Sequence, residues 1–357
     1  MTKIGLLGAG MIANIHGEAI VATESEIIAV YDPQEKIRNA FSKKWNCDSC
    51  SGVNALLDRS DIEAVVVATP NDQHASLAIA AMRAGKDVLL EKPMAMSLAQ
   101  CDEVIQVQSE TGQVLQLGFV CRFSPAALVV KQMIDEGKLG AIRHARATLL
   151  RQRGIPGLGG WFTTKEMSGG GCLIDIGVHL IDLLSHLTSA ADPLRVLGNC
   201  SQTFSISTYG YDEMWSTPKP KGVFDVEDGV VASTSFSNGI TNQIDVSWAT
   251  HLPVSYIRDG ISIEGDKGAV WFDIWGDSIA YGESVDGKPV ETKVKVDVVI
   301  DEAWSDAFQG EHRAFAEGIA KRVVTSCAGT SEEGRKVQTI VEAIYKSDET
   351  QREVQLA

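Results

Sequence analysis

Two residues of this sequence, Lys92 and His179, stand in patterns that could move a proton to or from a substrate. Lys92 lies in Glu91-Lys92-Pro93, directly after the apolar run Asp87–Leu90. If that run is a strand of a parallel sheet, its carboxyl end opens onto the crevice where such sheets bind ligands. Desolvation and a nearby cofactor can then tune a lysine for proton transfer. Taken alone, the tripeptide is better explained by a surface lysine paired with Glu91.

His179 follows the glycine run Ser168–Gly171 and has acidic neighbours at helical spacing. Asp175 precedes it by four residues, so on a helix both side chains share one face, along with Asp182. A carboxylate beside an imidazole orients the ring and raises its basicity, as a general base near neutral pH requires. Alternatively, His179 is a buried histidine satisfied by one of these acids. A metal site that includes His186 is a further alternative, but no fourth ligand is apparent.

A glycine turn near the N-terminus has the form G-x-G-x-x-A. It follows an apolar run and precedes a helical stretch, which is the context of a dinucleotide-binding turn. Gly8 permits the tight turn, and Gly10 lets the backbone approach a pyrophosphate at the helix N-terminus, where Met11 and Ile12 follow. Ala13 allows close packing of the helix on the strand.

Asp32 ends the second apolar run, twenty-four residues after Gly8. A carboxylate there would accept hydrogen bonds from the adenosine ribose hydroxyls and repel a 2′-phosphate, which favours NAD over NADP. Alternatively, Asp32 caps the helix that follows Pro33. Arg38 lies nearby and could soften the preference for NAD.

The segment Thr69-Pro70-Asn71, with His74 three residues on, ends the preceding apolar run as Glu91-Lys92-Pro93 ends the next one. The carboxyl ends of parallel strands share one edge of a sheet, so we expect both segments to face the same crevice. Alternatively, His74 is a first-turn helix residue without a ligand.

The elements that must position these residues fall into two regions of the chain with different hydrophobic patterns. Up to about Phe119, short apolar runs alternate with helical stretches, which predicts a doubly wound α/β domain with parallel strands buried on both faces. The candidate strands are Ile4–Leu7, Ile27–Tyr31, Ala64–Ala68, Asp87–Leu90 and Val114–Leu117, with helices such as Gln34–Trp45 and His74–Ala84 between them. We expect this domain to occupy residues 1–122.

Beyond it, strands and hairpins predict an antiparallel or mixed sheet in a second domain, residues 123–357. Asn238-Gly239 between two apolar runs is a hairpin signal. The candidate elements are helices Pro125–Glu136, Leu173–Leu187, Ser305–Lys321 and Ser331–Ser347, and strands Ala141–Arg151, Val230–Phe236 and Thr241–Trp248.

Composition limits the class of protein. A chain of 357 residues with 44% hydrophobic and 22% charged residues is a folded protein of about two domains. Its net charge of -15, without a basic run, argues against a nucleic-acid partner. Because we find no apolar stretch of roughly 18 to 20 residues and no signal cleavage site after Ile4 to Ala13, we expect a cytoplasmic protein outside the membrane.

The cysteine content also indicates a cytoplasmic protein. Seven cysteines without regular spacing fit buried thiols in a reducing compartment. Cys47 and Cys50 form one C-x-x-C without a second pair, whereas a zinc ribbon needs four ligands. We expect no metal.

Taken together, the motifs resemble the Gfo/Idh/MocA oxidoreductase family, which acts mainly on sugars and cyclitols. The matching elements keep the family's order: Gly8–Ala13, Asp32, Thr69-Pro70-Asn71 with His74, Glu91-Lys92-Pro93, Gly118–Pro125 and Gly169–Asp182, with the closing Glu342–Tyr345 also similar. The resemblance implies an N-terminal Rossmann domain and a C-terminal α+β domain with a large open, mainly antiparallel sheet. The uncovered face of that sheet would pack against another subunit, giving a homo-oligomer.

The resemblance also implies a role for individual residues. Lys92, joined to Pro93 by a cis bond, would hydrogen-bond the reacting oxygen; His179 would be the acid/base, and Asp175 would position substrate and histidine. Thr69, Asn71, His74, Glu91, Lys92 and Arg122 would lie along the cofactor. Ahead of the glycine run, Trp161 and, less directly, Arg151 and Arg153 could contact sugar hydroxyls or stack on a ring.

The implied activity is hydride transfer between NAD(H) and a ring secondary hydroxyl, or its ketone, of a sugar, glycoside or cyclitol. Two other functions are compatible with the fold: an NAD-retaining glycosidase that uses transient oxidation, and a non-catalytic NAD-binding regulator. Intact Lys92, Asp175 and His179 argue against the regulator. Thr208–Asp228, with Tyr209, Tyr211 and Trp215, is predicted to be a long loop that could fold over the site or a neighbouring subunit.

Overall fold

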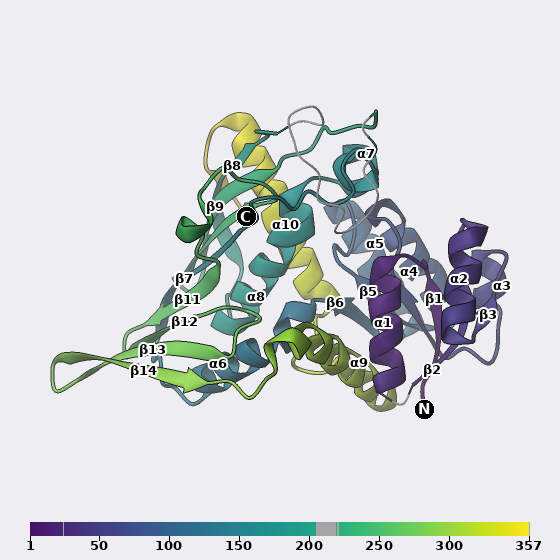
Figure 1. The fold of residues 1–357 in the computed structure, drawn as a ribbon, viewed down its shortest axis with the longest axis horizontal. Helices are drawn as coiled ribbons and strands as arrows, with labels where there is room; N and C mark the ends of the chain where they lie inside the picture. Colours follow the sequence, from purple (N-terminus) through teal and green to yellow (C-terminus); the bar gives the residue numbers. More distant parts are fainter. Residues whose placement is uncertain (24, 205–218, 220, 357) are drawn as a thin grey trace. The chain divides into compact units, whose positions relative to one another are not determined.

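The chain folds into two compact units. The computed structural model describes residues 1–23, 25–204, 219 and 221–356. The first unit comprises Met1–Val120 and Ser305–Gln338, and the second comprises Cys121–Trp304 and Thr339–Ala357. The expected division after residue 122 follows chain order, whereas the first unit also contains the C-terminal stretch from Ser305. Figure 1 shows the helix of that stretch, α9, in yellow-green beside the purple α1.

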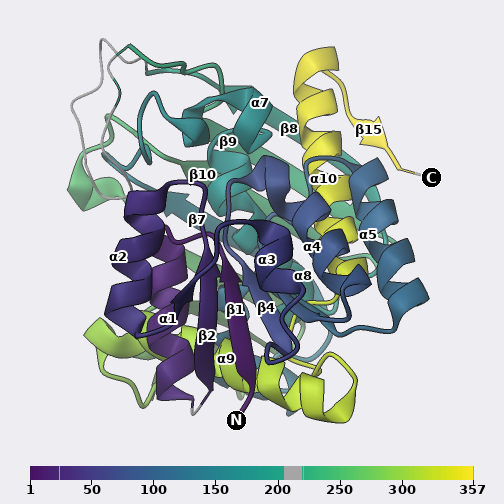
Figure 2. The same ribbon diagram turned by 90° about the vertical axis from the view of Figure 1, so that its right-hand side faces the viewer.

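A six-stranded, all-parallel sheet forms the centre of the first unit. Its order is β3-β2-β1-β4-β5-β6, with the reversal between β1 and β4 that marks the ligand crevice of a doubly wound sheet. Figure 2 shows β2, β1 and β4 side by side. The strands are β1 Lys3–Leu7, β2 Glu26–Tyr31, β3 Asp48–Ser49, β4 Ala64–Val67, β5 Asp87–Glu91 and β6 Leu115–Gly118. The five predicted strands are confirmed, and β3 is added at the edge.

Helix α5 of the first unit shows typical capping chemistry at both ends. Ser97 caps α5 by accepting a hydrogen bond from the backbone N–H of Gln100, and Gly112 ends it at φ 66°. The helices are α1 Met11–Ala22, α2 Glu35–Trp45, α3 Val53–Leu57, α4 His74–Arg83, α5 Leu98–Thr111 and α9 Ala303–Lys321, with the start of α10 Ser331–Thr350.

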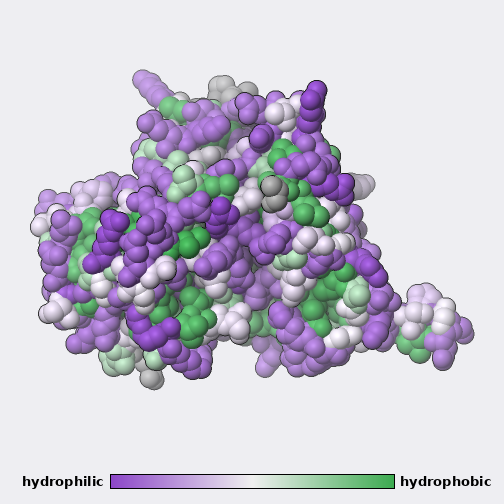
Figure 3. Space-filling view, turned by 180° about the vertical axis from the view of Figure 1, so that it is seen from behind, coloured by the Kyte–Doolittle hydropathy of each residue, from purple (hydrophilic) through white to green (hydrophobic). Residues whose placement is uncertain are grey.

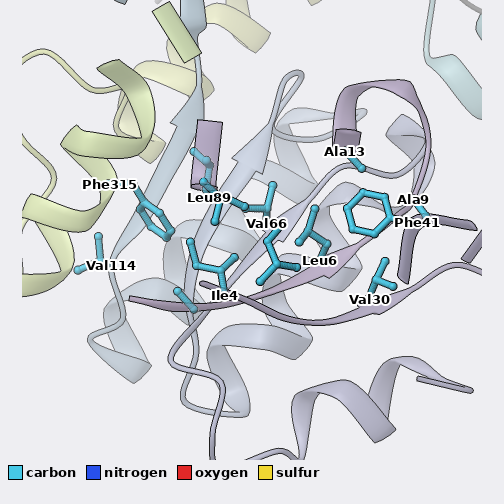
Figure 4. Packing of buried hydrophobic residues seen from close by; sticks show 13 residues of the cluster. Ile4, Leu6, Ala9, Ala13, Val30, Phe41, Val66, Leu89, Val114 and Phe315 are labelled. Atoms are coloured by element: carbon cyan, nitrogen blue, oxygen red, sulfur yellow. The ribbon is translucent and has the colours of Figure 1, made fainter. Parts of the chain in front are cut away.

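Apolar side chains from sheet and helices make one core in the first unit. Leu6 and Val66 of neighbouring strands are both fully buried at its centre. Figure 4 shows Phe315 of α9 on the same cluster, near Val114 and Leu89. Burying a side chain of this size contributes about 1.5–3 kcal/mol, so α9 belongs with the first unit although it lies nearly 200 residues beyond β6.

A nine-stranded sheet forms the second unit, in the order β14-β13-β12-β11-β7-β10-β9-β8-β15. β7 and β10 pair in parallel and the other described pairs are antiparallel, so the expected fold class is confirmed. The strands are β7 Ile142–Leu150, β8 Pro193–Ser201, β9 Gly229–Phe236, β10 Thr241–Ser247, β11 Gly260–Gly265, β12 Gly268–Phe272, β13 Ser278–Val285, β14 Lys288–Lys295 and β15 Val354–Gln355. The hairpin predicted at Asn238-Gly239 joins β9 to β10.

Residues alternate across this sheet between a covered and an open face. α8 packs on β7 and β10 on the covered side. Leu197, Val231 and Trp271 lie on the open side and are 55%, 59% and 47% exposed. Figure 3 shows the surface from behind, with hydrophobic patches among hydrophilic residues. The helices are α6 Pro125–Asp135, α7 Lys165–Ser168, α8 Val178–Thr188 and the remainder of α10.

One run of the second unit, Lys165–Thr188, is long and apolar enough to cross a membrane, contrary to the expectation from the sequence. However, 78% of its most apolar window is buried inside the protein. The core helix of a folded domain has this property, and the run includes α8, which covers the sheet.

Candidate active site

The glycine turn leaves the start of α1 open to an anion. Gly8 has a φ of +101°, and a Cβ there would lie 2.3 Å from the carbonyl oxygen of Ala68, so only glycine fits. At Gly10, in contrast, an added Cβ would meet nothing within 4 Å among the described atoms. Nor does any described side chain cap α1, and its first turn has no acidic residue. Such a helix start offers unsatisfied N–H donors and partial positive charge, which suits a pyrophosphate.

Asp32 lies at the end of β2, against the glycine turn. Its Oδ2 accepts a hydrogen bond from the backbone N–H of Ala9 at 3.1 Å, and its Oδ1 accepts one from Gln34 at 2.8 Å. The first contact places the carboxylate beside the turn, as a ribose ligand requires, and the second is the local capping contact that the sequence also allowed. Arg38 donates to the backbone oxygen of Asp32 at 2.8 Å and to Ser49 Oγ at 2.9 Å.

His74 links the segments that follow β4 and β5. Its Nδ1 lies 2.7 Å from the backbone oxygen of Pro93 and its Nε2 lies 2.9 Å from that of Thr69. The ring is buried, and burial lowers its pKa, so the neutral imidazole donates one of these two hydrogen bonds. His74 therefore braces two loops at one edge of the sheet, where Thr69 and the buried Asn71 also lie.

Lys92 directly follows β5 and is half-buried, between the buried Glu91 and Pro93. The Lys92–Pro93 peptide bond is cis, as the resemblance implied. The backbone N–H of Lys92 donates to Oε2 of Glu91 at 3.1 Å, and Oε1 of Glu91 lies 3.0 Å from Nε2 of His16. The carboxylate of Glu91 thus binds the backbone N–H of Lys92, whose side chain is partly buried.

The glycine run before His179 makes room for a buried carboxyl group. A Cβ on Gly171 would lie 1.8 Å from the backbone oxygen of Glu227, and a Cβ on Gly170 would lie 1.9 Å from Oη of Tyr345. Oε1 of Glu227 accepts hydrogen bonds from the backbone N–H groups of Gly171 and Leu173 at 2.8 and 3.1 Å and from Oη of Tyr345 at 3.0 Å. This carboxyl group therefore fixes the beginning of the helical segment that carries Asp175 and His179.

The helix predicted over Leu173–Leu187 is not α-helical throughout. Leu173–Gly177 forms a π-helical turn that continues into α8, and such turns are frequent at functional sites. From Gly171 to Leu184, Asp175 and His179 are the two residues that keep part of their surface exposed. Oδ2 of Asp175 accepts a hydrogen bond from Nε1 of Trp248 at 2.9 Å. The expectation that Asp175 and His179 share one face agrees with this exposure.

Asp182, three residues after His179 on α8, differs from Asp175 and His179 in burial and in its partner. Asp182 is buried, and its two carboxylate oxygens accept hydrogen bonds from Nε and Nη2 of Arg122 at 2.8 and 2.6 Å. Removing one partner of a buried ion pair typically costs about 3–5 kcal/mol. Arg122 therefore anchors α8 through Asp182. The resemblance implied, in addition, that Arg122 lies along the cofactor.

The suggested substrate residues have local partners. The ring of Trp161 stacks on that of Phe162 at 3.8 Å between centroids. Nη1 of Arg151 lies 3.5 Å from the backbone oxygen of Gly154, and Nη1 of Arg153 donates to the backbone oxygens of Gln152 and Thr250 at 2.6 and 3.3 Å. Most of the predicted loop Thr208–Asp228, including Tyr209, Tyr211 and Trp215, lies outside the described residues.

The Cys47 thiol is not activated. Burial raises its pKa to about 11, and none of the seven cysteines forms a disulfide. Within residues 1–23, 25–204, 219 and 221–356, His, Cys, Asp and Glu side chains form no group of three or more that could hold a metal ion.

Three residues with site contacts carried no motif: His16, Glu227 and Trp248. A fourth, Tyr345, closes the segment Glu342–Tyr345 that the resemblance included. A signal existed for two of them. His16 is a polar residue in the mainly apolar helical stretch after the glycine turn, and Glu227 is a charged residue three positions before the apolar run Val230–Phe236. Either pattern marks a buried polar group that needs partners, but their partners are 75 and 54–118 residues away.

Replacing Glu227 with glutamine is expected to change the pH dependence of stability in a defined direction. Burial raises the pKa of Glu227 above its ordinary 4.5. The folded protein therefore binds this proton more tightly than the unfolded chain, and the free energy of unfolding falls as pH rises above about 4.5. A glutamine oxygen can accept the same three hydrogen bonds, so Glu227→Gln should lose this slope. Denaturant titrations from pH 5 to 8 measure it.

Glu227→Ala serves as the contrasting variant. It leaves two buried N–H groups without an acceptor, so it should lose at least about 2 kcal/mol at every pH. Equal slopes in the wild type and in Glu227→Gln would contradict the assignment of the buried proton to this carboxyl group.

Known proteins match the chain over its length. A family model described as "Oxidoreductase family, NAD-binding Rossmann fold" matches residues 2–119, and the "GFO/IDH/MocA C-terminal domain" matches residues 127–271. D-glucoside 3-dehydrogenase of Escherichia coli (strain K12) is 27% identical over 99% of this chain and 97% of its own length. Inositol 2-dehydrogenase of Rhizobium meliloti (strain 1021) is 27% identical over 66% of this chain and 79% of its own. The structure of levoglucosan dehydrogenase with NADH and levoglucosan superimposes with a TM-score of 0.86, at 22% identity and 99% coverage of both chains.

Proposed function

Because the chain belongs to the Gfo/Idh/MocA oxidoreductase family, we propose that it transfers hydride between NAD(H) and a ring secondary hydroxyl, or its ketone, of a sugar, glycoside or cyclitol. The observation that carries the proposal is the half-exposed pair Asp175 and His179 on an otherwise buried helical segment. The names of similar proteins, a D-glucoside 3-dehydrogenase and an inositol 2-dehydrogenase, support the substrate class.

In this mechanism the side chains of the chain handle the proton and the developing charge. When bound, the nicotinamide supplies the hydride acceptor or donor. His179 takes the proton of the substrate hydroxyl as the C–H bond breaks and the carbonyl forms, while Asp175 orients the imidazole. The ammonium group of Lys92 hydrogen-bonds the reacting oxygen and stabilises the negative charge that develops there. In the reverse direction, the same groups return a proton to the ketone oxygen.

The cofactor site fits the residues of the first unit. The open approach at Gly10 and the uncapped N-terminus of α1, with Met11 and Ile12, support pyrophosphate binding. Asp32 is proposed to bind the ribose hydroxyls, which favours NAD over NADP. Thr69, Asn71, His74, Glu91, Lys92 and Arg122 remain the positions proposed from the resemblance to lie along the rest of the cofactor.

Substituting Asp32 tests the cofactor preference. Asp32→Ser is expected to lower kcat/KM for NAD⁺ about 10–100-fold, because hydrogen bonds to a charged group contribute about 1.5–3 kcal/mol. The relative use of NADP⁺ should rise, since Arg38 lies beside this position. Initial rates with both cofactors measure the change, and Asp58→Ser, an exposed acid of the same unit, is the control. An unaltered NAD⁺/NADP⁺ ratio would rule out the ribose role.

The activity itself is tested by NADH absorbance. Purified protein and NAD⁺ are mixed with a panel of sugars, glycosides and inositols. Absorbance that rises with one substrate supports the dehydrogenase. Cleavage of a glycoside without net NADH would instead support the glycosidase that retains its cofactor. Bound NADH with neither reaction would favour the regulator.

We also propose that the protein is a cytoplasmic homo-oligomer. The free cysteines are compatible with a reducing compartment. The open face of the nine-stranded sheet exposes Leu197, Val231 and Trp271, which supports packing of this face against a second copy. Light scattering measures the subunit number.

A further inference from the structure

Behind the backbone of Lys92, the first unit contains a chain of three buried ionisable side chains. Glu91 ends β5, His16 lies on α1 and His312 lies on α9. Nε2 of His16 is 3.0 Å from Oε1 of Glu91, and Nδ1 of His16 is 2.9 Å from Nε2 of His312. The three residues are 6%, 0% and 2% exposed. No step of the proposed mechanism uses the two histidines.

The protons of this chain can be assigned from the chemistry of its members. Burial holds the pKa of His312 well below its ordinary value, so its ring is neutral and has one N–H group. An ionised Glu91 only accepts hydrogen bonds, so Nε2 of His16 must donate to it. A neutral His16 then accepts from His312 through Nδ1, and a protonated His16 donates to both neighbours. In either state, His16 directs an N–H at Glu91.

Glu311 does not compete for this role. It neighbours His312 on α9 and is fully buried, and its carboxyl oxygens have no hydrogen-bond partner within the described part of the chain. Burial, followed by the negative charge of Glu91, raises its pKa well above the ordinary value. Burial therefore favours the neutral acid form of Glu311, and Glu91 is the carboxyl group that contacts His16.

The second oxygen of Glu91 connects this chain to Lys92. Oε2 accepts the backbone N–H of Lys92 at 3.1 Å, so the orientation of the carboxylate fixes the backbone at the reactive lysine. The neighbouring strand leaves room for it, because a Cβ on Gly118 would lie 3.3 Å from Oε1 of Glu91. His16 and Gly118 thus both lie close to Oε1 of the carboxylate.

We propose that His16, supported by His312, is a positioning residue for Lys92. It orients the carboxyl group of Glu91, so that the backbone of Lys92 stays fixed while its ammonium group stabilises the reacting oxygen. The proposal rests on the proposed role of Lys92. It adds two buried histidines to that site, one of them on the C-terminal helix α9, and gives a chemical reason for α9 to join the first unit.

Two amide substitutions at His16 separate its two hydrogen bonds. In His16→Gln the amide nitrogen reaches the place of Nε2 and still donates to Glu91. In His16→Asn the amide reaches only the place of Nδ1, so the contact with Glu91 is lost. We expect His16→Asn to lower kcat about 10–100-fold, the effect of losing one hydrogen bond to a charged group. KM for the substrate and the Kd for NADH should change less than about threefold, and His16→Gln should retain most of kcat.

A second readout does not depend on turnover. The hydrogen-exchange protection of the Lys92 amide, measured by NMR, should fall in His16→Asn and persist in His16→Gln, while the amides of β1 serve as internal controls. Equal kcat values in the two variants, or unchanged protection at Lys92, would overturn the proposal even if sugar oxidation is established. If protection responds as expected but no panel substrate is oxidised, the proposed function fails and the hydrogen-bonded chain to Lys92 stands.

Discussion

Lys92→Met should lower kcat for oxidation of the ring hydroxyl by about 10²–10³-fold, the usual effect of removing one preorganised donor to a developing oxyanion. Methionine keeps the length and apolar stem of lysine and removes only the charge. The backbone of Lys92 is held by Glu91, and the following Pro93 is held by His74, so the substitution should leave the loop in place. Stopped-flow or steady-state NADH absorbance measures kcat.

The comparison needs a variant that removes a lysine charge elsewhere. Lys44 forms an exposed ion pair with Glu18 at 3.4 Å, and such pairs contribute little. Lys44→Met should therefore keep kcat and the melting temperature of the wild type. If Lys92→Met kept more than a tenth of the wild-type kcat while binding NADH normally, Lys92 would not stabilise the reacting oxygen.

The parts of the fold that were predicted are those decided by neighbours in the chain. β5 is read from a continuous apolar run, and the β9–β10 hairpin is read from Asn238-Gly239, where Gly239 adopts a φ of +83°. The same holds for Gly8, whose positive φ is required by the turn itself. Local steric and hydrogen-bonding rules fix these features, so a single sequence reveals them.

The remaining features depend on partners that are distant in sequence. The π-helical turn at Leu173–Gly177 begins beside Glu227 and Tyr345, and Asp182 turned out to pair with Arg122, 60 residues away. The sequence predicts an apolar face on α9, but it does not predict which surface that face packs against. From the sequence, Phe315 could equally have covered the second sheet. Its packing near Val114 and the contact between His16 and His312 reveal the choice.

The residues of the candidate site also divide into those that local sequence patterns predict and those that depend on distant partners. Asp175, His179, Lys92 and the glycine turn were identified because chemistry-bearing residues lay within four positions of one another or directly after a strand. The groups that hold them were missed. Glu227, Trp248 and His16 each contact the site through one or a few hydrogen bonds, and a single bond across 54–118 residues leaves no local pattern.

His179→Asn is the other substitution with a large expected effect. General acid–base catalysis by a positioned side chain contributes about 10²–10⁴-fold, and an asparagine amide cannot take up the substrate proton. We therefore expect kcat to fall by about that factor near pH 7, with NADH affinity unchanged because His179 is not among the residues proposed to bind the cofactor. The defect should shrink as pH rises, since hydroxide can then remove the proton in place of the imidazole. A pH series of kcat measures both effects.

His186→Asn is the matched control, because it removes a second imidazole from the same helix, α8. If His179 acts as a base oriented by Asp175, His186→Asn should keep nearly full activity, and added chelator should have no effect on the wild type. Joint loss of activity in both histidine variants, reversed by added divalent metal, would instead support the metal site that Asp175, His179 and His186 could form. A His179→Asn variant that retained more than a tenth of kcat at pH 7 would refute the base assignment. The outcome would then place proton transfer on Lys92 alone, whose substitution would have to abolish both directions of the reaction.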